Sequence, residues 1–211
     1  MKINYNSRQI LFNELKGDNY GIKGVPQDYI KYMLDIGAAY GLISIMARLL
    51  HPEMKICAIE PHPETYKDLI VNCERLKIET INCAFGNGDL FYLEKERKMK
   101  LCNSFASETK DTISIQSYTL SDLVKMNKYD PSDMMIKMDC ESAEWYMVGN
   151  KEDEEIIKKC KLMSIEIHDK SKNNPIDKFY SWIIGLVGIT HKITINKLTE
   201  NLGLVKIWQG F

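Results

Sequence analysis

Short apolar runs alternate with amphipathic stretches along most of the chain. The runs are bounded by glycine, proline or charged residues, which is typical of buried strands. Strands are expected at 32–37, 55–60, 78–83, 134–139 and 162–167, with an exposed strand at 112–117 and tail strands at 191–196 and 204–208. Helices are expected at 41–50, 64–76, 119–126 and 176–187, with a further helix starting near Ser142. This alternation predicts an α/β fold: a Rossmann-like sheet of about seven mostly parallel strands, flanked by helices on both faces.

The 211 residues are expected to form one domain, 1–211, large enough to bury a core and a small-molecule cleft. Most of the predicted strands lie in residues 33–169, which form the expected core. Residues 1–32 are an N-terminal segment and a candidate lid, and residues 170–211 hold the last helix and a strand pair. A polar gap at 169–175 is predicted to be a mobile or substrate-facing loop.

Composition and charge restrict the classes of partner. The formal net charge is -1 and the pI is about 6.4, so no global cationic field favours duplex nucleic acid or an anionic membrane as a partner. The six cysteines are scattered without a C-x-x-C pair, which indicates reduced thiols. No apolar stretch reaches the roughly 18 residues of a membrane helix. A cytoplasmic protein is therefore expected, and the sequence carries no signal for its oligomeric state.

The loop after the first strand, "LDIGAAYG", carries Asp35 at the strand end and then Gly37 and Gly41. Glycines here allow a close backbone approach to a ligand. A dinucleotide site favours G-x-G-x-x-G, but position 39 is alanine. A G-x-x-x-G loop preceded by an acidic residue suits S-adenosylmethionine, which has no phosphate and carries an amino group. An ordinary tight turn of an α/β protein is the alternative.

Two further strand ends support a nucleoside cofactor. Glu60 ends the second strand, where this fold places a carboxylate on ribose hydroxyls; a helix-capping or surface glutamate is the alternative. The third strand runs into "NCAFGNGD", where an adenine ring could lie against Cys83, Ala84 and Phe85. Ordinary core and turn residues are the alternative for each of these three.

Six motifs in order give the chain a family resemblance: "LDIGAAYGLIS", "AIEPHPETYKDLIVN", "NCAFGNGD", "YTLSDL", "IKMDCESAEWYMV" and "SIEIHD". Over roughly residues 33–169 it resembles the FkbM family of S-adenosylmethionine-dependent methyltransferases, which implies a class I methyltransferase fold. The family mostly methylates hydroxyls on sugars and natural products. The resemblance implies O-methylation of a hydroxyl on a sugar, glycan or small metabolite.

A set of residues is expected to bind the cofactor, and the resemblance implies this role for the glycine loop and for the acidic end of the second strand. The set consists of Asp35, Gly37, Ala38, Tyr40, Gly41, Glu60, Pro61, Cys83, Ala84, Phe85 and Asp139. Two positions depart from the family pattern, since the family commonly has asparagine where this chain has Ala39 and glycine where it has Ser142.

Three carboxylates follow the fourth central strand, in the run "MIKMDCESAEW". Methyl transfer to oxygen requires alignment of the acceptor and removal of its proton. Asp139 is interpreted as the residue nearest to this chemistry, because the end of this strand is expected to face the methyl group. Glu141 follows in the turn and can reach the same opening. Glu144 is interpreted as a helix-dipole partner or a surface charge.

The next strand adds Glu166 and His168 on one face, with Asp169 just beyond. A buried carboxylate needs a counter-charge, so Lys137 and Glu166 are expected to form an ion pair that positions Asp139. The alternative is that Lys137 participates in the reaction itself. His168, as a neutral imidazole, can accept a hydroxyl proton.

A magnesium ion is an alternative aid to deprotonation, held by Asp139 with Glu166, His168 or Asp169. No dense ligand motif demands a metal, so no metal ligand is assigned.

Two other classes of function stay open. A nicotinamide-dependent oxidoreductase shares the architecture but is opposed by the missing second glycine. A catalytically silent S-adenosylmethionine-binding protein would bind the cofactor without turnover. Methylation of planar amines is disfavoured, because "DCES" follows the fourth strand instead of an Asn/Asp-Pro-Pro-aromatic motif.

Overall fold

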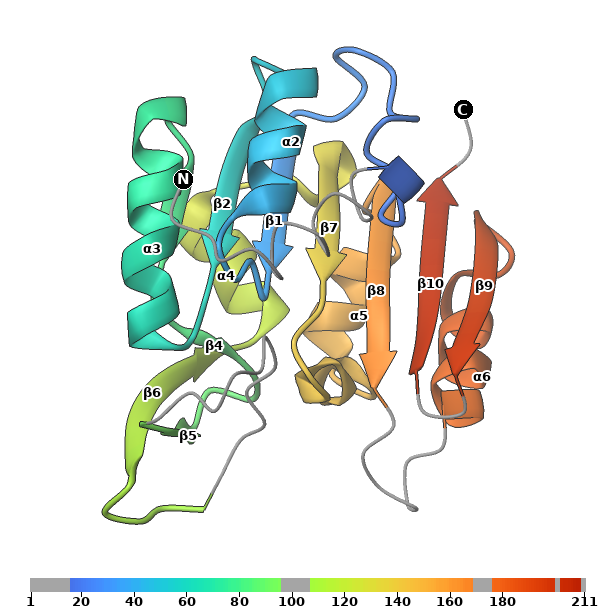
Figure 1. The fold of residues 1–211 in the computed structure, drawn as a ribbon. Helices are drawn as coiled ribbons and strands as arrows, with labels where there is room; N and C mark the ends of the chain where they lie inside the picture. The colour runs from blue at the N-terminus through green and yellow to red at the C-terminus, as the bar shows by residue number, and fades with distance from the viewer. Residues whose placement is uncertain (1–15, 96–106, 169–175, 200–201, 210–211) are drawn as a thin grey trace.

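The computed structural model describes residues 16–95, 107–168, 176–199 and 202–209 (Figure 1). Its centre is a seven-stranded sheet with the order β3-β2-β1-β7-β8-β10-β9. These strands are β1 (Tyr32–Ile36), β2 (Lys55–Ile59), β3 (Glu79–Ile81), β7 (Met134–Met138), β8 (Leu162–His168), β9 (His191–Thr199) and β10 (Leu202–Gln209). Neighbours from β3 to β8 are parallel, and β10 runs antiparallel to β8 and β9. The predicted Rossmann-like sheet is confirmed.

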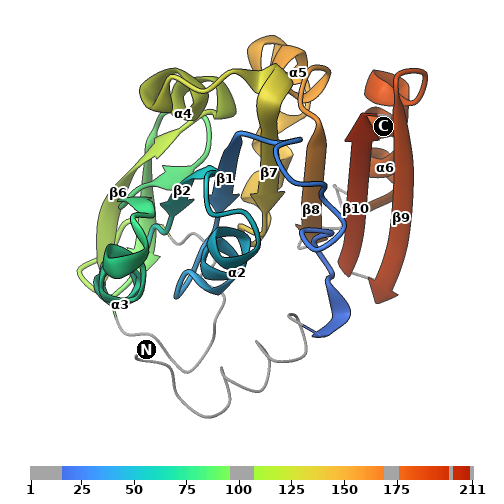
Figure 2. The same ribbon diagram turned by 90° about the horizontal axis from the view of Figure 1, so that it is seen from above.

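Helices cover both faces of the sheet, as the view from above shows (Figure 2). The helices are α2 (Leu42–Leu50), α3 (Pro63–Cys73), α4 (Leu120–Asn127), α5 (Lys151–Ile157) and α6 (Ile176–Val187). Side chains of α2 and α3 pack into one apolar core, and those of α4, α5 and α6 pack into a second core on the other face. The central strands are therefore buried on both sides, which explains their nearly continuous apolar sequences.

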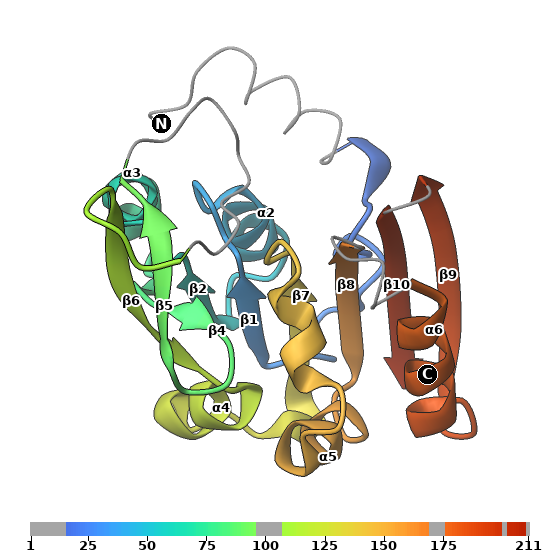
Figure 3. The same cartoon turned by 90° about the horizontal axis from the view of Figure 1, so that it is seen from below.

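A small second sheet lies below the central one in Figure 1 and in front in Figure 3. Its order is β4-β6-β5, formed by β4 (Ala84–Phe85), β6 (Thr112–Tyr118) and β5 (Leu90–Glu94). The predicted strand at 112–117 is confirmed as antiparallel to β5. The predicted third strand was too long, because the chain leaves the central sheet after Ile81 and its next residues pair with β6.

The prediction of an α-helix that begins near Ser142 is wrong. The segment Ala143–Met147 is a short 3-10 helix, η3, and α5 starts only at Lys151. The extended backbone of Val148 ends η3, and Gly149 follows with a φ of 82°. The side chain of Asn150 then accepts hydrogen bonds from two backbone amides at the start of α5. Two further 3-10 turns are η1 (Glu74–Leu76) and η2 (Pro131–Asp133).

The register of the sheet determines at which edge the candidate site lies. Ile36, the last residue of β1, pairs with Ile59 of β2 and with Met138 of β7. The chain therefore leaves these three parallel strands at the same edge, where ligands of such sheets bind.

Some predictions fall outside the described residues. They include the loop at 169–175, most of the charged run at 94–100, and the first half of the candidate lid at 1–32. In the part of the chain that the structure describes, no helix is long and apolar enough to cross a membrane.

Candidate active site

The loop between β1 and α2 is held by backbone contacts to its neighbours. The amides of Gly37 and Ala38 donate to the carbonyl of Ile59 at 3.0 and 2.8 Å. Gly37 has a φ of 74°, and a Cβ atom there would lie 1.8 Å from the carbonyl oxygen of Asp139. Glycine is required at position 37 because the loops after β1 and β7 cross in direct contact.

Gly41 also has a structural requirement, besides the cofactor approach that the sequence suggested. Its φ is 81°, and a Cβ atom there would lie 2.6 Å from Leu69 and 2.8 Å from Cys73, both side chains of α3. A side chain at this position would thus collide with the neighbouring helix, so the glycine serves the packing of α3. The predicted close approach of a cofactor at Gly41 stays a prediction.

Glu60 ties the first two loops together. It is 5% exposed, and its carboxylate accepts from the amide of Ala39 at 3.1 Å and from the amide of His62 at 2.9 Å. Ala39 has a φ of 48°, a left-handed conformation that asparagine adopts more readily than alanine. The predicted ribose contact of Glu60 stays a prediction.

The other predicted cofactor residues occupy two kinds of position. Tyr40 and Pro61 are partly exposed and accept hydrogen bonds through their carbonyls from Asn72 and Asn82. Four more are buried, with 6% exposure or less: Ala38, Cys83, Ala84 and Phe85. Other parts of the protein already cover the side chains of these four residues, so an adenine ring could contact them only where that cover is displaced.

Asp35 and Lys137 form a buried ion pair, which corrects the predicted pairing of Lys137 with Glu166. Lys137 Nζ lies 3.2 Å from Asp35 Oδ1 and donates to the carbonyl of Gly37 at 2.8 Å. The other oxygen of Asp35 accepts from the amide and hydroxyl of Ser44 at 3.2 and 2.7 Å. Because Asp35 is fully buried, it would not contact a cofactor directly. It would act on the cofactor by holding the loop between β1 and α2 in place.

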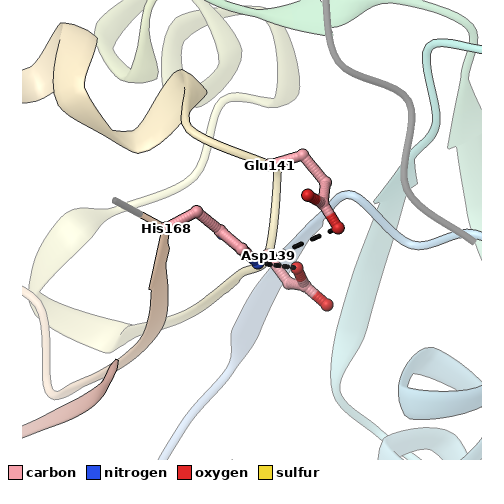
Figure 4. A group of neighbouring side chains, drawn as sticks. All are labelled: Asp139, Glu141 and His168. Atoms are coloured by element: carbon pink, nitrogen blue, oxygen red, sulfur yellow. Dashed lines mark ion pairs between the residues drawn. The ribbon is translucent and has the colours of Figure 1, made fainter. Parts of the chain in front are cut away.

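Four predicted catalytic side chains converge at the ends of β7 and β8. His168 Nε2 lies 3.8 Å from an oxygen of Asp139, 3.8 Å from Glu141 and 3.9 Å from Glu166. Figure 4 shows Asp139, Glu141 and His168 pointing toward one another from the two strand ends. All four side chains keep some solvent exposure, from 12% for His168 to 31% for Asp139. This acidic cluster, defined as Asp139, Glu141, Glu166 and His168, is accessible to a substrate.

Glu144 lies in the first turn of η3 as an acidic residue, but it is not a surface charge, which corrects that part of the prediction. Its side chain is fully buried and accepts from the amide of Ser142 at 2.8 Å and from the amide of His168. His168 Nδ1 lies 3.3 Å from the same carboxylate. Trp145 adds a hydrogen bond from its indole to the carbonyl of His168 at 3.0 Å. Glu144 therefore fixes the orientation of the imidazole ring.

Tyr20 is a site residue that sequence reasoning missed. Its hydroxyl lies 3.0 Å from Glu166 Oε2 and 3.4 Å from Asp139 Oδ2, and its ring is 5.4 Å from Lys137 Nζ. The residue is 4% exposed, and its carbonyl accepts from the hydroxyl of Ser164 at 2.8 Å. Tyr20 thus links the N-terminal segment to the acidic cluster.

Burial and neighbouring charges shift the pKa values of the cluster. Burial raises the pKa of Asp139, against the influence of Lys137 and His168. Burial, with the charge of Asp139, raises the pKa of Glu166 to about 7. Burial alone would lower the pKa of His168, but the hydrogen bond with Glu144 and the surrounding carboxylates raise it to about 8. The cluster can therefore exchange protons near neutral pH.

Solved structures show that this arrangement of strands is shared with methyltransferases. A precorrin-6y C5,15-methyltransferase from Geobacter metallireducens has a TM-score of 0.53 at 11% identity, covering 93% of this chain and 88% of its own. An rRNA methylase from Streptococcus thermophilus has a TM-score of 0.52 at 12% identity, with 99% and 98% covered. The fibrillarin pre-rRNA processing protein of Methanococcus jannaschii has 0.53 at 17%, with 94% and 76% covered. At such identities the likeness concerns the fold alone.

A search of curated proteins finds no match to this sequence. The sequence does match the methyltransferase FkbM domain over residues 35–183, a range that includes the end of β1, the glycine loop, Glu60 and the whole acidic cluster. Membership of this family implies S-adenosylmethionine as the methyl donor. The chain belongs to the FkbM family of methyltransferases.

Proposed function

We propose that this methyltransferase transfers a methyl group from S-adenosyl-L-methionine to a hydroxyl on a sugar, a glycan or another small metabolite. The observation that carries the proposal is the partly exposed acidic cluster at the ends of β7 and β8, around His168. An alcohol is a poor nucleophile until its proton is removed, so this reaction requires proton-accepting groups beside the acceptor oxygen.

Different residues of the site would hold the donor, orient the acceptor and accept its proton. The bound donor supplies a sulfonium methyl: the acceptor oxygen bonds to that carbon, the carbon–sulfur bond breaks, and its electron pair stays on sulfur. Asp139 orients the acceptor hydroxyl, and the hydroxyl proton passes to the pair of Asp139 and Glu166, which share the Tyr20 hydroxyl. Glu60 and the loop at 37–41 hold the donor, with Asp35 and Lys137 supporting that loop from below.

The charge of the cluster favours a hydroxyl over an amine or RNA as the acceptor. Its carboxylates would keep an amine in the protonated ammonium form, which has no lone pair for the attack. The same negative charge repels phosphates, and the net charge of -1 gives no global cationic field to offset that repulsion. The family assignment likewise favours methyl transfer over the nicotinamide-dependent oxidoreductase.

The test is a screen of sugars, glycosides and hydroxylated metabolites with S-adenosylmethionine, scored by the mass gain of one methylation. NMR of each product then assigns the new methyl to oxygen or nitrogen. Products methylated on oxygen are expected; products methylated only on nitrogen would refute the proposal, as would methylation of an RNA sample assayed in parallel when none of these acceptors is methylated. With the best acceptor, Asp139→Asn should lower turnover by about 100-fold or more, while calorimetry should show nearly unchanged binding of S-adenosylhomocysteine.

The matched control is Glu53→Gln. Glu53 is an exposed carboxylate between α2 and β2, at the opposite edge of the parallel sheet. It should keep parental turnover. Equal losses in both variants would remove Asp139 from the reaction.

A further inference from the structure

Three side chains of the acidic cluster have the spacing of metal ligands. Asp139, Glu141 and His168 each offer one ligand atom, and these atoms all lie within 4.8 Å of one another. The separations of 3.8 Å from His168 Nε2 to both carboxylates exceed a hydrogen bond. Ligand atoms about 2.1 Å from a common ion lie roughly 3–4 Å apart, so the same separations leave room for a cation between them. Figure 4 shows the three groups facing a common point.

The imidazole is held in the orientation that metal ligation requires. The fully buried carboxylate of Glu144 lies 3.3 Å from His168 Nδ1 and also accepts from the His168 amide. A carboxylate bonded to one ring nitrogen directs the other toward a metal in many metalloproteins. Nε2 accordingly faces the carboxylates, and among the described residues it has no hydrogen-bond partner.

The negative charges around His168 favour the binding of a cation. Four carboxylates lie within 4 Å of the ring nitrogens: Asp139, Glu141, Glu144 and Glu166. Among the described residues, Lys137 is the lysine whose charge acts on Asp139 and Glu166, and it is already paired with Asp35 and hydrogen-bonded to Gly37. A divalent ion that takes the place of the imidazole proton would compensate more of this negative charge than the protonated ring does.

We propose that Asp139, Glu141 and His168 bind one divalent cation, with Glu144 orienting the His168 ring. Two carboxylates and one imidazole suit ions such as Mn²⁺, and three protein ligands leave further positions for water and an acceptor oxygen. A cation there would ease loss of the acceptor hydroxyl proton, leaving Glu166 to receive it. This catalytic role rests on the proposed function, whereas the binding of the ion does not.

The experiment is a Mn²⁺ titration of the full chain after treatment with a chelator, in the absence of donor and acceptor. Free Mn²⁺ is measured by electron paramagnetic resonance, and competition with Mg²⁺ ranks the two ions. The parent protein should bind one equivalent. Glu141→Gln and Asp139→Asn keep the size of each side chain and should weaken binding at least 10-fold, and Glu144→Gln should weaken it by about 10- to 100-fold through the orientation of His168.

Melting of each variant in chelator controls for folding, and Glu53→Gln should bind as the parent does. The proposal is overturned if the parent binds no equivalent of Mn²⁺, or if Glu141→Gln and Asp139→Asn, folded as the parent is, bind as tightly as Glu53→Gln. Mn²⁺ binding without O-methylation would support this site and reject the proposed function. O-methylation that persists in chelator with no Mn²⁺ binding would do the reverse.

Discussion

Replacement of Lys137 by methionine tests which acid this lysine neutralises. Lys137 Nζ lies 3.2 Å from Asp35 Oδ1, and the two side chains are 4% and 0% exposed. Methionine is similarly long and flexible but carries no charge. The change Lys137→Met therefore keeps most of the packing and leaves the carboxylate of Asp35 buried without its counter-charge.

The structure sets the expected magnitude. Removing one partner of a buried ion pair destabilises a protein by about 3–5 kcal/mol. Asp35 retains two hydrogen bonds from Ser44, at 3.2 and 2.7 Å, so we expect the lower end, about 3 kcal/mol. For a chain of this length, 1 kcal/mol shifts the melting temperature by about 2–4 °C. The variant should thus melt about 6–12 °C below the parent.

Thermal and urea unfolding, followed by circular dichroism, provide the assay. The double variant with Asp35→Asn should recover about half of the loss, because the stranded charge is gone. Lys55→Met changes an exposed lysine at the start of β2 and should shift stability by no more than about 0.5 kcal/mol. If Glu166→Gln restored the stability of Lys137→Met and Asp35→Asn did not, the assignment of Asp35 as the partner would be refuted.

Three more changes test the backbone and one buried acid. Gly41→Val should lower the melting temperature before it affects any ligand, because its Cβ would meet Leu69 at 2.6 Å; parental melting with lost binding of S-adenosylhomocysteine would contradict this. Ser142→Gly should raise the free energy of unfolding by about 1 kcal/mol, since Ser142 has a φ of 85°; an unchanged urea midpoint would argue against strain. Burial raises the pKa of Asp153 to about 6 from an unfolded value near 3.9, so its contribution to stability is full below pH 4 and lost as the pH rises through 6. Urea titrations should therefore show that the free energy of unfolding of the parent falls between pH 4 and pH 7. In Asp153→Asn this fall should be smaller by about 1–2 kcal/mol, after allowance for solvent screening. Equal falls in the two proteins would exclude the effect.

The central sheet could be predicted because each inner strand is an apolar run with a distinct end. The small sheet was harder to predict. β4 has only two residues, Ala84–Phe85, and it forms because Phe85 meets Tyr118 of β6, more than thirty positions along the chain. β5 follows a turn and is exposed at both of its ends. Neither segment has a periodic pattern of its own, so only the tertiary pairing defines them.

Much of the candidate site could be predicted because its residues follow the ends of predicted strands. Asp139 and Glu141 come after β7, and Glu166 and His168 end β8, and parallel neighbours bring these ends together. Tyr20 could not be found in this way. It reaches Glu166 across 146 positions of sequence from a segment without regular periodicity, so no local signal marks it.

The strand register explains why Lys137 pairs with Asp35, which the sequence pattern alone could not predict. Side chains alternate along a strand, so Lys137 and Glu166 were both plausible members of one buried face. The register places Lys137 opposite Asp35 on β1 and opposite Ser164 on β8. Neighbouring strands lie about 4.8 Å apart and each residue advances about 3.3 Å, so a residue two positions beyond the opposite one is about 8 Å away instead of about 5 Å. Glu166 is two residues beyond Ser164, so the lysine pairs with Asp35, and Glu166 remains available to Tyr20 and the acidic cluster.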